Sequence, residues 1–110
     1  AFWPAAVEAF PQSGQLWFGY GNALWAQDKQ QEALAAFEKA VRYAPQLAAA
    51  WNNLAYAQQA AGNTKQAKQS ICQALSIAPD DTAILDSVSE LNAQSCALSS
   101  APSSGCCATN

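Results

Sequence analysis

The stretch from Trp17 to Pro45, WFGYGNALWAQDKQQEALAAFEKAVRYAP, decides the fold, because its pattern returns 34 residues later. The second copy, from Trp51 to Pro79, reads WNNLAYAQQAAGNTKQAKQSICQALSIAP. Seven positions are identical in the two copies, among them Trp17 and Trp51, Ala23 and Ala57, Ala33 and Ala67, Ala40 and Ala74, and Pro45 and Pro79. A fixed period that preserves small and large apolar positions indicates a stacked repeat.

Each copy has the pattern of two helices joined by a short turn. Apolar residues recur at helical spacing within residues 15–27 and again within residues 31–44, and the polar run at 28–30 separates them. Pro45 ends the second helix, since proline cannot continue a helix and disfavours helical geometry one residue earlier. Gly62 marks the corresponding turn of the second copy.

Small residues are expected to let the paired helices approach closely. Gly21 of the first helix should face Ala33 of the second, while the larger Trp17 and Phe37 fill the flanks. Such layering of large against small side chains gives a dense core.

The rest of the chain extends this repeat at both ends. Pro11 continues the 34-residue spacing of Pro45 and Pro79, so residues 1–13 are interpreted as the second helix of an incomplete repeat. The sequence thereby suggests a fragment of a longer protein. The expected helices cover Pro4–Phe10, Gln15–Gln27, Gln31–Ala44, Leu47–Ala61, Thr64–Ala78 and Ala83 to about Ala97. The last of these, within residues 82–98, has the one-sided apolar pattern of a capping helix and includes Leu98, and the small polar residues 99–110 are predicted to be disordered.

The repeat residues resemble those of the tetratricopeptide repeat (TPR) family. The resemblance covers residues 14–47 and 48–81 and departs from the family pattern at Gln58, where a bulkier apolar residue is usual. It implies an all-α fold, an α-α superhelix or solenoid of antiparallel helix pairs that ends in a capping helix. It also implies that the first helices of successive repeats line a concave groove.

The groove residues are carried over from the family position by position. The resemblance places three aromatic side chains and several amides and acids in the groove: Phe18, Asn22, Trp25, Asn52, Tyr56, Gln59, Asp86 and Glu90. Apolar anchors beside amide donors and acceptors suit an extended peptide. The alternative is that Phe18 and Trp25 merely cover the ends of their own helix.

Two narrower resemblances concern TPR proteins that bind a terminal carboxylate and TPR regions of peptidase proteins. TPR proteins that hold a terminal carboxylate use basic side chains where this chain has Phe18, Ala83 and Ser87, so that activity is not implied, although Asn22 and Asn53 match the asparagines. The runs at 17–23 and 48–55 are similar to the TPR region that follows a C39-type cysteine peptidase domain in some bacterial envelope proteins. The catalytic residues of such a protein would lie outside this sequence.

The composition argues against several functions. The net charge is −3 with five basic residues, which disfavours nucleic-acid binding, and no apolar run is long enough for membrane insertion. The sequence contains no histidine and no glycine-rich phosphate loop, and its four cysteines (Cys72, Cys96, Cys106 and Cys107) lack the spacing of a zinc site. Their disulfide state depends on the compartment, which the sequence leaves open between cytoplasm and bacterial envelope. We therefore predict no catalytic residue, no metal and no cofactor, and no enzymatic role for this chain.

The sequence supports two hypotheses on function. The first is a protein–protein interaction module that binds an extended peptide or a partner helix in the groove. The second is a structural spacer or self-association segment of a larger protein, with a homodimer formed through Phe2, Trp3 and Phe10 at the edge of the incomplete repeat.

Overall fold

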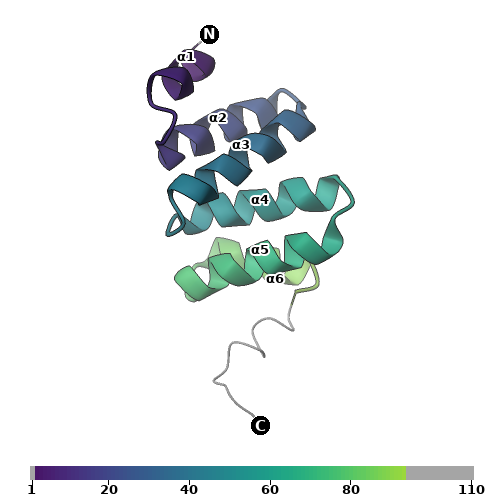
Figure 1. Ribbon diagram of the computed structural model, residues 1–110. Helices are drawn as coiled ribbons and strands as arrows, with labels where there is room; N and C mark the ends of the chain where they lie inside the picture. The colour runs from purple at the N-terminus through teal and green to yellow at the C-terminus, as the bar shows by residue number, and fades with distance from the viewer. Residues whose placement is uncertain (1, 94–110) are drawn as a thin grey trace.

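A computed structural model describes residues 2–93, which form six α-helices stacked in chain order from the N-terminal end to the C-terminal end (Figure 1). The helices are α1 (Phe2–Ala9), α2 (Gly14–Ala26), α3 (Gln30–Tyr43), α4 (Ala48–Ala60), α5 (Thr64–Ile77) and α6 (Thr82–Glu90). No strand occurs among the described residues. The expected tail at residues 99–110, and Leu98, lie outside the described part of the chain.

The helices stack in chain order. The closest packing lies within the pairs α2–α3 and α4–α5, while α3 also packs on α4 and joins the two pairs. Helix α1 lies against α2, and α6 packs on α5 and touches α4. The predicted all-α repeat is confirmed, because each helix contacts only its near neighbours, as in a solenoid. No helix in the described region is long and apolar enough to cross a membrane.

Polar side chains mark the starts of two helices. The Ser13 side chain accepts a hydrogen bond of 3.3 Å from the backbone N–H of Leu16 at the start of α2. At the start of α6, one Asp81 carboxylate oxygen accepts hydrogen bonds from the backbone N–H groups of Ala83 and Ile84. Both are N-cap residues, which satisfy helix donors that lack a partner within the helix.

Helices α2, α4 and α6 end in the same way. Asp28, Gly62 and Asn92 each follow one of these helices with a positive φ, of 63°, 86° and 55° respectively. In each case the N–H of the next residue donates a hydrogen bond to the carbonyl five residues earlier, for example Ala93 to Val88 at 2.8 Å. This is the Schellman motif, which satisfies the last carbonyls of a helix.

The motif at Asn92 corrects one expectation from the sequence. The last helix was predicted to continue to about Ala97, but α6 ends at Glu90. A left-handed Asn92 cannot continue a right-handed helix, and Ala93 folds back into the core, where it is fully buried.

The two complete pairs use different side chains at equivalent core positions. A Cβ atom on Gly21 would lie 2.5 Å from the ring of buried Phe37, so this glycine makes room for the ring rather than for Ala33 alone. In the second pair, Ala55 and Ile71 occupy the corresponding positions in one core cluster. The larger Phe37 is therefore matched by the smaller Gly21.

The departure at Gln58 has a physical explanation. Its side chain is buried at the position equivalent to Leu24, and its Oε1 accepts a hydrogen bond of 2.6 Å from the Ser70 hydroxyl on α5. Ser70 in turn replaces Ala36 of the first pair. A buried polar pair is tolerated when each group satisfies the other.

Candidate binding groove

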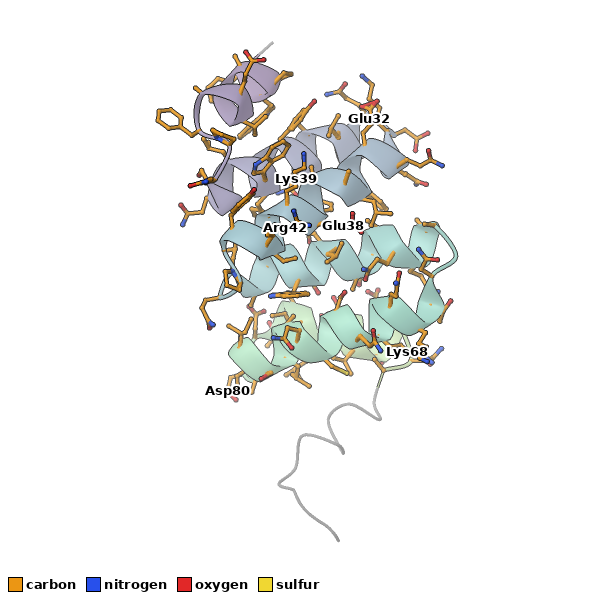
Figure 2. The ribbon with its side chains drawn as sticks, viewed as in Figure 1. Glu32, Glu38, Lys39, Arg42, Lys68 and Asp80 are labelled. Atoms are coloured by element: carbon orange, nitrogen blue, oxygen red, sulfur yellow. The ribbon has the colours of Figure 1, made fainter. Side chains whose placement is uncertain are left out.

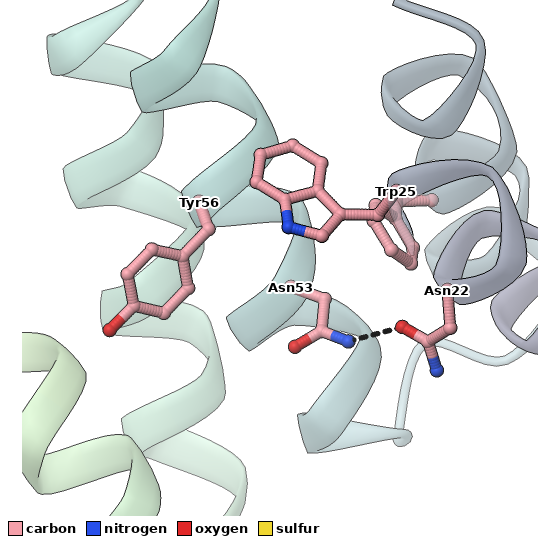
Figure 3. A pocket seen from close by; sticks show the side chains of 5 residues that line it. Asn22, Trp25, Asn53 and Tyr56 are labelled. Carbon is pink, nitrogen blue, oxygen red and sulfur yellow. Dashed lines mark hydrogen bonds between the residues drawn. The ribbon is translucent and has the colours of Figure 1, made fainter. Parts of the chain in front are cut away.

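A pocket opens between α2 and α4, the first helices of the two complete pairs. It has a volume of about 160 Å³ and is lined by Asn22, Trp25, Phe37, Asn53 and Tyr56 (Figure 3). Asn22 and Trp25 come from α2, and Asn53 and Tyr56 from α4. The 3.6-residue helical period places residues three apart on one face, so each helix contributes one amide and one aromatic side chain.

The two asparagines form a direct link between the helices. The Asn53 side-chain amide donates a hydrogen bond of 2.7 Å to Asn22 Oδ1, as Figure 3 shows. Asn53 Oδ1 in turn lies 3.4 Å from the amide nitrogen of Asn52. An asparagine amide carries two donor hydrogens, so the exposed Asn22 amide keeps donors for a ligand.

The aromatic side chains form the apolar part of the pocket. Phe37, which is 1% exposed, lines it from α3, while Trp25 and Tyr56 line it from α2 and α4 and are half-buried. In Figure 3 the Trp25 indole N–H faces the side of the pocket where Asn53 and Tyr56 lie.

The other tryptophans of the repeat have structural roles. The indole N–H groups of Trp17 and Trp51 donate to the carbonyls of Pro11 and Pro45 at 2.7 and 2.9 Å. The 34-residue spacing of the prolines thus fixes two tryptophans within the fold. Trp25 stands outside this pattern, and its indole N–H meets no acceptor among the five pocket residues.

Tyr56 connects the pocket to the last helix. Its hydroxyl donates a hydrogen bond to Oε1 of Glu90 on α6. Burial, together with this hydrogen bond, raises the pKa of Tyr56, because both disfavour the phenolate next to a carboxylate. The bond also holds the Glu90 carboxylate at the α6 side of the pocket.

The structure brings together some of the residues that the sequence placed in the groove. Asn22, Trp25 and Tyr56 line the pocket, and Glu90 reaches it through Tyr56. The Phe18 ring instead packs on Phe37 with 6.3 Å between centroids.

The remaining predicted groove residues lie outside the pocket lining. Asp86 and Gln59 are exposed on α6 and α4. Asn52 is half-buried, and its Oδ1 is buried without a hydrogen-bond partner in the described structure.

Two lining residues were not among those predicted. Phe37 was assigned only to the core, yet it also lines the pocket. Asn53 was noted for its match to an asparagine of the family but not placed in the groove. The signal that identifies Asn53 is its position three residues before Tyr56, the same spacing that joins Asn22 to Trp25.

The described residues provide no set of side chains for metal chemistry. Residues 2–93 contain no cluster of three or more histidine, cysteine or acidic residues able to hold a metal ion. Cys72 is a half-buried free thiol packed against the core of the second pair. Cys96, Cys106 and Cys107 lie outside the described residues.

Stacked antiparallel helix pairs with a 34-residue period, and a pocket shared by their first helices, define a helical-repeat protein. The family model described as tetratricopeptide repeat matches residues 24–91, and the chain belongs to this family. TPR is a non-catalytic repeat fold that generally serves protein–protein interaction. No curated protein matches the chain, and nothing in the comparisons supports the similarity to a C39-type peptidase protein.

Proposed function

We propose that this chain binds an extended peptide or a partner helix in the groove between α2 and α4. The observation that carries the proposal is the pocket itself, where an aromatic residue and an amide from each of two helices converge over Phe37. An apolar anchor residue of a partner would bury itself between Trp25 and Tyr56. The free amide donors of Asn22 would bind main-chain carbonyls of the partner.

Affinity capture with matched variants tests the proposal. Trp25→Ala removes a pocket wall, while Tyr43→Ala removes an aromatic side chain that is 41% exposed on α3 and outside the pocket. We expect one partner from a lysate of the source organism to bind the unchanged chain and the Tyr43 variant, and not the Trp25 variant. Equal capture by all three would move the function away from this groove. Circular-dichroism melts check that both variants stay folded.

The exposed aromatic edge at α1 favours a second candidate, self-association. Phe2 and Phe10 are 69% and 65% exposed, although large apolar side chains are usually buried. This edge would support a role as a spacer or dimerisation segment of a larger protein. Analytical ultracentrifugation tests it: a dimer that dissociates in Phe2→Ser/Phe10→Ser would support the candidate, and a monomer at high concentration would count against it.

A further inference from the structure

Formal charges are divided between the two kinds of helix in this molecule. Helices α2, α4 and α6 contain no lysine or arginine, and their only charged residues are Asp86 and Glu90 of α6. Four of the five basic residues lie on α3 and α5, and the fifth, Lys29, directly precedes α3; Lys39, Arg42 and Lys68 are labelled in Figure 2. The two helices that form the groove, α2 and α4, therefore carry no formal charge, and the adjacent α6 carries only negative charge.

The Glu90 carboxylate lies where a groove ligand would meet it. One of its oxygens accepts from the hydroxyl of Tyr56, a pocket residue, which fixes the side chain beside the pocket. A carboxylate can accept several hydrogen bonds, so its other oxygen can accept from a ligand. The ammonium of Lys39 on α3 instead lies 4.5 Å from the centroid of the Trp17 ring.

We infer that the groove selects a cationic peptide, with an apolar residue in the pocket and a lysine or arginine at Glu90. This inference rests on the proposed function and names the chemistry of the partner. An extended chain advances about 3.3 Å per residue, so side chains two residues apart lie about 6.6 Å apart on one face. Tyr56 lines the pocket and donates to Glu90 through its hydroxyl, so the pocket and Glu90 are separated by one tyrosine side chain. The selected motif is therefore apolar, any residue, then Lys or Arg.

Electrostatics makes this choice selective. A charge-assisted hydrogen bond between Glu90 and a ligand cation is stronger than a neutral one. An acidic peptide would meet uncompensated like charge from Asp86 and Glu90, which disfavours its binding. Because the site is exposed, the preference should weaken as salt screens it.

The experiment uses a random twelve-residue peptide library displayed on phage and the full 110-residue chain as bait. Recovered peptides are synthesised, and their Kd is measured by fluorescence anisotropy for the unchanged chain and three variants. Glu90→Gln removes the charge but keeps an oxygen that can accept from Tyr56. Glu38→Gln makes the same change at an exposed position of α3 outside the pocket, and Trp25→Ala removes the pocket wall.

We expect enrichment of the apolar-x-Lys/Arg motif and a Kd weakened about twofold to fivefold by Glu90→Gln. Glu38→Gln should leave the Kd unchanged, and replacing the peptide's cation with glutamine should abolish the effect of Glu90→Gln. Peptides that lose affinity with Trp25→Ala but bind the Glu90 variant equally well would overturn the inference and leave the proposed function standing. Peptides insensitive to Trp25→Ala, or no enrichment at all, would overturn both.

Discussion

Gly21 and Phe37 show how single residues adjust to one another across a helix pair. The glycine lacks the Cβ that would lie 2.5 Å from the Phe37 ring, whereas Ala55 packs in the same core cluster as the smaller Ile71. Closely packed interiors respond to a change of even one methyl group. The two positions should therefore be coupled energetically rather than additive.

A double-mutant cycle tests this coupling. Gly21→Ala should destabilise the unchanged chain, because overpacking costs roughly 1–3 kcal/mol and exceeds the helix-propensity gain of alanine, about 1 kcal/mol. In a Phe37→Ile background, which copies the second pair, the same substitution should be neutral or stabilising. Urea unfolding gives both free energies. Equal effects in the two backgrounds would show that the ring does not depend on the glycine.

Tyr56 gives the molecule a predicted dependence on alkaline pH. Its folded-state pKa is raised above the ordinary value of about 10, because burial and Glu90 disfavour the phenolate. The resulting stability is fully present below the unfolded pKa and is lost as the pH rises through the folded pKa. The free energy of unfolding should thus fall above pH ~10 more steeply than in Tyr56→Phe. Parallel curves from pH 8 to 11 would contradict the assignment.

Among the elements, helices α2, α4 and α6 each end at a residue with left-handed backbone geometry. Gly62, with a φ of 86°, adopts this geometry without strain, whereas Asp28 and Asn92 do so with a side chain. Gly62→Ala should lower stability by about 1 kcal/mol, and Asp28→Gly and Asn92→Gly should raise it by a similar or smaller amount. Thermal melts measure the changes. Ala61→Gly, at an ordinary φ of −82°, is the control and should bring no gain.

The same residues explain how far the sequence predicts the elements. Prolines and the 34-residue period placed the paired helices to within about two residues, because these features act locally. The end of α6 was predicted too late, since asparagine also occurs within helices and only its φ reveals the Schellman motif.

Predicting the groove residues required knowing which side of each helix faces the pocket. Successive helical residues point about 100° apart, so Asn52 and Asn53 face different directions and the family positions favoured Asn52. The structure places Asn53 in the pocket, opposite Asn22. Phe37 could not be found from its own helix pattern, because its ring serves the core and the pocket together.

At the scale of the whole molecule, two core clusters share one bridging side chain. One cluster lies among α2, α3 and one face of α4 and the other among α4, α5 and α6, and the half-buried Trp51 packs against both. Its indole also donates to the carbonyl of Pro45, at the junction of the two pairs. Repeat proteins gain stability from each repeat and from the interface between neighbours, so Trp51 should carry much of their cooperativity.

Native-state hydrogen exchange separates local from global opening. Gly21→Ala should reduce the protection of amides in α2 and α3 more than that of amides in α5, because the damage lies in the first cluster. Adding Trp51→Ala should increase the difference in protection between the two pairs. Trp51 packs against both core clusters, so its loss should weaken the coupling between them. Phe37→Ile/Trp51→Ala serves as a control for the loss of core volume. If Gly21→Ala lowers protection equally in all helices, the chain unfolds as one unit and the two clusters form a single cooperative core.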